Sequence, residues 1–200
     1  MLRIWLFGFI IVLFSACREK AGEYTISGSL QNNKYDGEIV YLVPLKGANQ
    51  SNVDSTIIKD GKFSFEGKVD SVGIFILRTR PLLRFKLEEI LIVKEPGTVL
   101  VNFGEDSFAT GTALNDSLQK WKDHKKIFAK TSYALSESGK NDNNVIIEKM
   151  ETLKSGMRNY YTRFIIYNSK NIVGKSVFQF VKDELTEEQI IRIRKYLEDE

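Results

Sequence analysis

Residues 53–69, VDSTIIKDGKFSFEGKV, contain two short runs of strand-forming residues on either side of Asp60 and Gly61. An Asp-Gly pair supplies positive φ at both central positions of a type I′ turn, whose twist matches that of two paired strands. Polar and apolar residues alternate after the turn, so Phe63 and Phe65 share one face of the second strand. The stretch therefore predicts a β-hairpin whose phenylalanines face a core.

The same alternation of apolar and polar residues continues on both sides of this hairpin. Further strands are predicted at residues 24–30, 39–43, 72–79, 90–93 and 98–103. Between the last two lies Glu95-Pro96-Gly97-Thr98, in which Pro presets φ and Gly takes the positive φ of a type II turn, so we expect a second hairpin there. About seven strands with such turns predict an antiparallel β-sandwich over residues 24–110.

From Leu114 onward the apolar residues recur at the spacing of a helix. Leu114, Leu118, Trp121 and Phe128 predict a first helix, and a polar turn is expected at residues 136–144. A second helix is expected to run from about residue 146 to 168, and a third over residues 173–185. A fourth is predicted to begin at a capping box, with N-cap Thr186 and Gln189, flanked by a hydrophobic staple of Leu185 and Ile190. The predicted fold class is thus α+β, with a helical region over residues 111–200.

The N-terminus has the organisation of a signal peptide. Residues 4–14, IWLFGFIIVLF, form an apolar run that is too short to cross a bilayer, which takes about 20 residues. Ser15 and Ala16 are the small residues of a cleavage site, and Cys17 follows them directly. This arrangement resembles the lipobox of bacterial lipoproteins, with Phe14 at the position that is usually Leu.

The lipobox resemblance implies that residues 1–16 are removed and that the Cys17 thiol carries diacylglycerol. Cleavage would fall between Ala16 and Cys17, and residues 17–23 would form the acylated N-terminus and tether. Two or three acyl chains anchor a protein stably, at about 0.8 kcal/mol per buried CH₂. We therefore expect a place in the bacterial cell envelope, at the outer membrane. An ordinary secretory signal, or a cytosolic protein with an apolar N-terminal helix, is the alternative.

Several passages of the mature chain resemble one family. YTISGSL, GEIVYL, VDSTIIKDGKFSFEG and FATGTALNDSLQKW resemble the domain of unknown function 4369, over about residues 22–121. This is the N-terminal β-domain of TlpA/ResA-like thiol-disulfide oxidoreductase lipoproteins. The segment NIVGKSVFQFVKDELTEEQIIRIRKYL resembles the stretch that leads into their thioredoxin-like domain. Cys17 is the only cysteine, so no Cys-x-x-Cys pair exists onto which the redox residues of the family could be carried.

Other candidate site residues have simpler structural explanations. His124 is the only histidine and lies in KDHKK, on the predicted polar side of the first helix, so we expect it to be solvated. The pairs Glu88-Glu89 and Glu187-Glu188 are a weak glycosidase pattern, and acidic residues in a first helical turn also complement the helix dipole. Residues 78–86, RTRPLLRFK, could contact lipid headgroups or an acidic partner, but a charged edge strand explains them better. Residues 120–130 are expected to form a solvated, lysine-rich helix face.

Composition narrows the classes of function further. The formal net charge of +3 is too small to predict nucleic-acid binding. The sequence has no Gly-rich phosphate loop and no Gly-x-Ser-x-Gly, and no cofactor or metal site is predicted. We therefore expect a non-catalytic lipoprotein that binds a ligand or a protein partner in the envelope, with its oligomeric state open. The alternative is the N-terminal positioning part of a TlpA-like oxidoreductase whose thioredoxin-like domain is missing from this chain.

Overall fold

In the computed structural model of this chain, the residues that can be described form eight strands followed by four α-helices. The structure describes residues 22–30, 33–79, 89–104, 106–138 and 143–198. The predicted cleavage site at Ala16 and Cys17, and the tether up to residue 21, lie outside the described residues.

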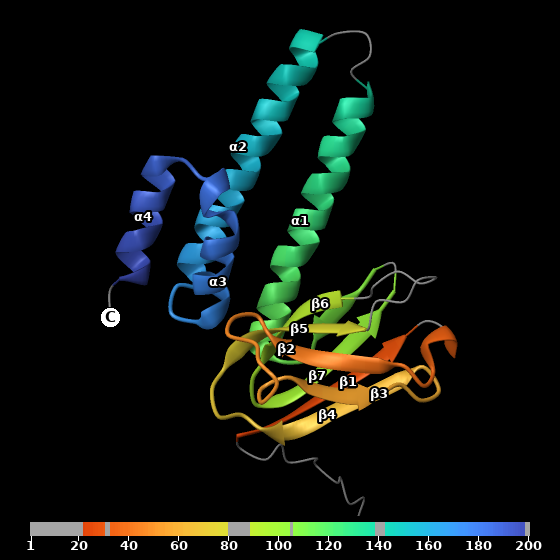
Figure 1. Cartoon of the computed structure of the whole chain (residues 1–200). Coiled ribbons are helices and arrows are strands. Elements are labelled where there is room, and N and C mark those ends of the chain that lie inside the picture. Colours follow the sequence, from red (N-terminus) through yellow and green to blue (C-terminus); the bar gives the residue numbers. More distant parts are fainter. Residues whose placement is uncertain (1–21, 31–32, 80–88, 105, 139–142, 199–200) are drawn as a thin grey trace, which may run out of the picture.

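The strands form two four-stranded sheets that face each other (Figure 1). Sheet A has the order β4-β1-β7-β8 and sheet B the order β3-β2-β5-β6. The strands of sheet A are β1 (Glu23–Leu30), β4 (Lys62–Lys68), β7 (Gly97–Phe103) and β8 (Phe108–Thr110). Those of sheet B are β2 (Ile39–Pro44), β3 (Asp54–Ile57), β5 (Gly73–Thr79) and β6 (Glu89–Lys94). The α+β prediction is confirmed, and the extra strand is the three-residue β8.

The strand pairings are antiparallel with one difference from the expected sandwich. β1 and β7 run parallel, with Ile26 opposite Val99. Parallel neighbours need a crossover rather than a tight turn. Here the intervening chain supplies it by passing through all of sheet B between the two strands.

The Asp60-Gly61 turn has the predicted backbone. Asp60 has φ of 51° and Gly61 has φ of 65°, the two positive values that a type I′ turn requires. Lys59 and Lys62 exchange two backbone hydrogen bonds of 2.9 Å across the turn. Beyond this single bridge the two arms separate, because β3 pairs with β2 in sheet B and β4 pairs with β1 in sheet A. The turn is as predicted, but the predicted hairpin is wrong, because the turn is a corner that joins the two sheets.

The second predicted hairpin is wrong. Gly97 has the expected positive φ, at 112°, but β6 and β7 do not pair with each other. β6 pairs with β5 in sheet B, and β7 pairs with β1 and β8 in sheet A. The sequence pattern identifies a reversal of the chain but does not distinguish a reversal within one sheet from a passage to the opposite sheet.

The sandwich core lies between the two sheets. Phe63 and Phe65 are 5% and 4% exposed, as the alternation of the sequence predicts. The ring of Phe63 lies directly over Gly28, its cross-strand partner, so closely that a Cβ on Gly28 would lie 1.8 Å from the ring. A close approach of this kind requires glycine in the middle of a strand. Phe63 also contacts Phe103, with ring centroids 5.7 Å apart, which extends the core across sheet A.

The helices are α1 (Ala113–Ser138), α2 (Asn143–Tyr167), α3 (Ile172–Val181) and α4 (Glu187–Leu197), with a short 3₁₀ turn, η2 (Lys182–Glu184), between the last two. Of the helices, α1 and α3 pack on the outer face of sheet B, and α2 and α4 pack against the other helices. Ile74 of β5 and Val93 of β6 belong to the same buried cluster as Leu118, Trp121 and the apolar residues of α3. Figure 1 shows α1 and α2 projecting together away from the sandwich, with α3 and α4 beside α2. Sheet B therefore separates two hydrophobic cores.

The helix boundaries agree closely with the periodicity of the sequence. The capping box at Thr186 is present, because its hydroxyl accepts the N–H of Gln189 and the Gln189 side chain accepts the N–H of Thr186. Glu187 and Glu188 lie in the first turn of α4, as expected. The third helix is shorter than predicted, since it ends at Val181 and continues only as the 3₁₀ turn.

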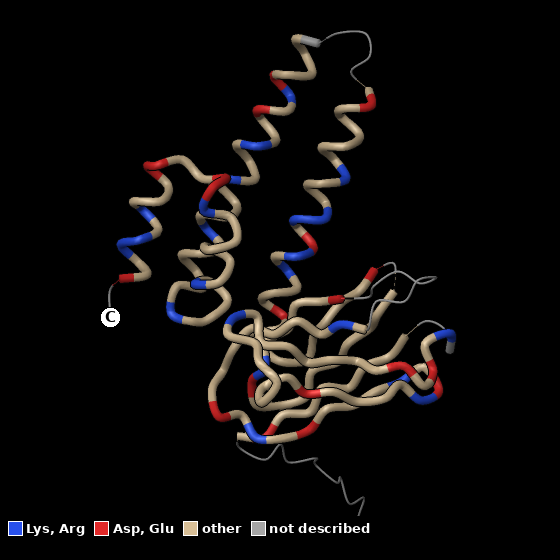
Figure 2. Tube along the Cα trace, in the orientation of Figure 1, with Lys and Arg blue, Asp and Glu red and all other residues tan. Residues whose placement is uncertain are grey.

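Charged residues of both signs are spread over the helices and the rim of the sandwich (Figure 2). No helix in the described part of the chain is both long and apolar enough to cross a membrane.

Candidate functional site

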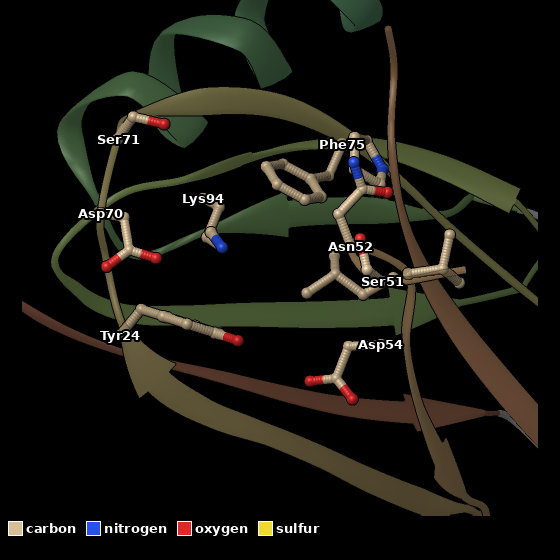
Figure 3. A pocket seen from close by; sticks show the side chains of 11 residues that line it. Tyr24, Ser51, Asn52, Asp54, Asp70, Ser71, Phe75 and Lys94 are labelled. Carbon is tan, nitrogen blue, oxygen red and sulfur yellow. The ribbon is translucent and has the colours of Figure 1, made fainter. Parts of the chain in front are cut away.

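A cleft of about 570 Å³ opens between the two sheets where β1 begins. Tyr24 of sheet A forms one wall, and Phe75 and Lys94 of sheet B form the facing wall (Figure 3). Two loops complete the rim, one before β3 and one between β4 and β5. They contribute Ser51, Asn52, Val53, Asp70 and Ser71, and Asp54, the first residue of β3, lies beside them. A volume between about 300 and 1,000 Å³ is typical of small-molecule sites.

Lys94 places its ammonium between two aromatic rings. Its Nζ lies 4.8 Å from the ring centroid of Phe75 and 5.3 Å from that of Tyr24, within the range of cation–π attraction. No carboxylate of the described residues forms an ion pair with it. Lys94 is thus a cation held in place by aromatic faces, with its hydrogen-bond donors directed into the cleft.

The Asp54 carboxylate acts on the phenol of Tyr24 at one side of the cleft. Burial, and secondarily the negative charge of Asp54, raise the pKa of the Tyr24 phenol. The phenol is therefore protonated at neutral pH and presents a hydroxyl donor to the cleft. Asp54 Oδ1 accepts the backbone N–H of Ser55 at 2.7 Å. Figure 3 shows the Asp54 carboxylate and the Tyr24 hydroxyl at the same side of the cleft.

Asp70 lies on the loop between β4 and β5, on a different side of the cleft from Asp54 (Figure 3). Its side chain has no hydrogen bond or ion pair within the described residues. Ser71 follows it on the same wall. The Asp70 carboxylate is therefore available to a ligand.

The loop before β3 is held by its own asparagines. Asn52 Oδ1 accepts the N–H of Asn49 at 2.8 Å, and Asn52 Nδ2 donates to the carbonyl of Gly47 at 3.0 Å. Asn49 Oδ1 in turn accepts the N–H and the hydroxyl of Ser51. Side-chain to backbone bonds of this kind fix turns. Asn52 therefore shapes the rim next to Asp54, and its amide is already engaged.

Glu95, the next residue after Lys94, connects this wall to the helices. Its Oε1 accepts the Thr112 hydroxyl at 2.5 Å and the backbone N–H of Leu114 at 2.9 Å, which caps the start of α1. Because successive side chains of a strand point to opposite faces, Lys94 points into the cleft and Glu95 points toward α1. The cleft wall and the first turn of α1 are thus fixed to the same strand end.

Residues 24–118 match the family model of a domain of unknown function, DUF4369. The match covers the whole sandwich and ends in the second turn of α1, after the residues that Glu95 caps. All residues that line the cleft lie within the DUF4369 region. No curated protein and no solved structure matches the chain.

None of the candidate residues weighed from the sequence that the structure describes lines the cleft. His124 of α1 is exposed, but its ring stacks on Tyr160 of α2 with centroids 4.0 Å apart, so it takes part in the contact between the two helices. Arg78 lies on β5, which pairs on both sides, so the segment RTRPLLRFK begins in an interior strand rather than an edge strand. Residues 80–88 of that segment, including Glu88, lie outside the described residues, and Glu89 begins β6.

The lysine-rich face of α1 is only partly solvated. Lys122 donates from Nζ to the Leu91 carbonyl at 3.1 Å, and burial lowers its pKa to about 8. Lys125 lies over the ring of Trp121, with Nζ 5.3 Å from the centroid, and Lys126 pairs with Asp106. Lys122 and Lys126 therefore connect α1 to the sandwich, whereas the Lys125 contact lies within α1 itself.

Sequence reasoning missed the cleft, although one signal for it was present. In β6 the inward-facing positions are Ile90, Ile92 and Lys94. A charged residue at the inward position of a strand marks either an open end of the sandwich or a site. Asp54 begins β3 and Asp70 lies in the loop between β4 and β5, and only the fold brings them together.

A second hollow, of about 610 Å³, lies on the outer face of sheet B. Tyr41, Ser55 and Arg78 contribute to its floor, and the loop before β3 forms its side. Val53 lines both this hollow and the cleft. Its only charged lining residue is Arg78, whereas the cleft gathers charges of both signs.

Proposed function

We propose that this chain is a non-catalytic, lipid-anchored protein of the bacterial envelope that binds a small ligand in the cleft between its sheets. The observation that carries the proposal is Lys94, a cation between two aromatic rings that faces two carboxylates across an open cleft. Such groups bind and orient a polar molecule without further chemistry. The shape of the cleft is supported from outside by the asparagine-held loop and by the cap that Glu95 places on α1.

The lipid anchor rests on the LFSAC motif at residues 13–17. Tyr24 follows Cys17 by seven residues, and an extended chain spans at most about 3.5 Å per residue. The start of β1 would then lie within about 25 Å of the acylated cysteine. The proposal therefore places the cleft close to the membrane surface.

Intact mass spectrometry of the protein extracted from membranes of its own host tests the anchor. The proposal predicts the mass of residues 17–200 plus acyl chains, and a shift to the soluble fraction for Cys17→Ser. A mass without acyl chains contradicts the anchor. A mass larger by about one domain would favour the alternative, the N-terminal positioning part of a TlpA-like thiol-disulfide oxidoreductase, which rests on the resemblance of the last helices.

Native mass spectrometry of the same preparation tests the binding function. We expect a small molecule to be retained by the wild-type chain and lost from Lys94→Met, which keeps the apolar stem between the two rings. Lys62→Met is the matched control, because Lys62 is exposed on β4 and does not line the cleft. Equal ligand retention in all three proteins, or in none, contradicts the proposed site.

A further inference from the structure

We infer that the cleft takes a small zwitterion, a molecule that carries a carboxylate and at least one ammonium group, such as a free amino acid or the end of a peptide. This inference rests on the proposed binding function and specifies its ligand class. It follows from the three charged groups that face the cleft and from the partners they have within the protein.

The ligand carboxylate is assigned to Lys94. The Nζ atom is fixed by Phe75 and Tyr24, at 4.8 and 5.3 Å from their ring centroids, and it has no carboxylate partner among the described residues. Cation–π attraction holds the ammonium without neutralising it. An incoming carboxylate therefore finds a positioned cation and the Tyr24 hydroxyl beside it, both of which donate hydrogen bonds.

The ligand ammonium is assigned to Asp70 and Asp54. Asp70 has no internal partner in the described part of the chain, and Asp54 uses only Oδ1, on the N–H of Ser55. Two carboxylates against one lysine leave the cleft with an excess of negative charge. A ligand with only anionic groups would satisfy Lys94 but would be repelled by both aspartates. A ligand with charges of both signs satisfies all three groups.

An acidic sugar is the competing class, since its hydroxyls could donate to the aspartates. A hydroxyl and an ammonium both donate hydrogen bonds to a carboxylate, but only the ammonium adds the Coulomb attraction of a full positive charge. Because Asp70 and Asp54 stand on different sides of the cleft, a ligand with two ammonium groups and one carboxylate would satisfy both (Figure 3). The charges of the cleft therefore favour an ammonium-bearing ligand over a hydroxyl-bearing one.

Isothermal titration calorimetry on the full chain in detergent tests this assignment with L-lysine as the probe. Three compounds accompany it: 1,5-diaminopentane, which is lysine without its carboxylate, norleucine, which lacks the side-chain ammonium, and D-glucuronate, an acidic sugar. We expect saturable binding of L-lysine, and at least tenfold weaker binding of each of the other three, because each lacks at least one of the charged groups that the cleft would pair.

The variants separate the two ends of the ligand. Lys94→Met is expected to weaken L-lysine at least tenfold but not 1,5-diaminopentane, which has no carboxylate for Lys94 and is repelled by its charge, whereas Asp70→Asn should weaken both compounds. The control Lys62→Met should bind all compounds as the wild type does. Asp70 is an exposed loop residue, so its substitution does not threaten folding, and the unfolding temperature of each variant verifies this.

The inference is overturned if L-lysine does not bind, if its affinity is unchanged in both cleft variants, or if D-glucuronate binds at least as tightly and depends on Lys94. The last result would leave the proposed binding function intact and replace only the ligand class. A retained host ligand without an ammonium group would do the same. If no ligand that depends on Lys94 is found in the native mass spectrum, the proposed function fails as well.

Discussion

The carboxylate of Glu95 accepts the backbone N–H of Asn115 at 3.1 Å, and the side chain of Asn115 in turn forms hydrogen bonds with β6, the strand that ends just before Glu95. Asn115 Oδ1 accepts the N–H of Val93 at 2.9 Å, and Nδ2 donates to the Val93 carbonyl at 2.8 Å. The side-chain amide thus pairs with β6 as a neighbouring strand would, at the edge of sheet B. This exchange fixes α1 on the sandwich.

Removal of the Glu95 cap should destabilise the protein. In Glu95→Ala, the Thr112 hydroxyl and the N–H groups of Leu114 and Asn115 lose their acceptor, and we expect a loss of about 2 kcal/mol in the free energy of unfolding. Urea denaturation measures this loss. Glu66→Ala on the exposed face of β4 is the control and should change stability by less than about 0.5 kcal/mol. Equal effects of the two substitutions would show that the cap contributes nothing.

Asn115→Leu tests the strand-like pairing of the amide. Leucine has a similar size but leaves the N–H and C=O of Val93 without partners in a buried place, so we expect a loss of about 2–4 kcal/mol. Asn144→Leu, on the exposed surface of α2, is the matched control and should be nearly neutral. A stable Asn115→Leu variant would mean that packing alone attaches α1 to sheet B.

Two glycine substitutions should have opposite effects on stability, because Gly28 contacts Phe63 and Gly156 has open space beside it. Gly28→Ala forces the Phe63 ring away from β1 and should cost about 1–3 kcal/mol, as overpacked cores do. Gly156→Ala lies in α2, where a new Cβ would meet nothing within 4 Å, and should stabilise the protein by about 0.5–1 kcal/mol. Thermal unfolding of both variants distinguishes these signs. A stabilised Gly28→Ala would contradict the packing described for the sandwich core.

Lys122 predicts a specific dependence of stability on pH. Its folded pKa is about 8, below the ordinary value of 10.5, so between these values the unfolded chain binds more protons than the folded one. The wild type should therefore gain stability relative to Lys122→Met as pH rises from 8 to 10.5, and the difference should be constant below about pH 7. Urea titrations of both proteins over this range measure it. If the difference in stability between the two proteins stayed constant over the whole pH range, the Lys122 ammonium would be solvated rather than buried.

The cleft makes its own electrostatic prediction. Asp54→Asn removes a negative charge near the Tyr24 phenol, so the raised pKa of Tyr24 should fall, while the larger contribution from burial remains. NMR titration of labelled tyrosines, with Tyr24→Phe to assign the signal, reports the shift. An unchanged or higher pKa of Tyr24 would show that the charge of Asp54 does not act on the Tyr24 phenol.

Much of the fold could be predicted because its signals are local. The alternation around Asp60-Gly61 placed Phe63 and Phe65 in the core, and Thr186 with Gln189 marked the start of α4. The pairing of β6 was not predictable from Glu95-Pro96-Gly97, since a tight reversal has the same local residues whether it stays in one sheet or crosses to another. The two hydrophobic cores on either face of sheet B favour the crossing, and these cores exist only in the folded chain.

The candidate site was less predictable than the fold, because its residues come together only in the folded chain. Lys94, Asp54 and Asp70 are spread over about 40 residues, and each has an unremarkable neighbourhood in the sequence. His124, the residue that chemistry would single out, turned out to stack on Tyr160, because α1 and α2 run side by side. The anchor at Cys17 remains a prediction from the sequence alone.

The most direct test of the central claim is a crystal structure of the protein purified from membranes of its own host. The account predicts electron density for a small molecule in the cleft, with one group bonded to Lys94 Nζ and another to Asp70. A cleft that contains only water, or one in which Lys94 pairs directly with Asp70 or Asp54 and closes the space, would contradict the claim that these residues form a binding site.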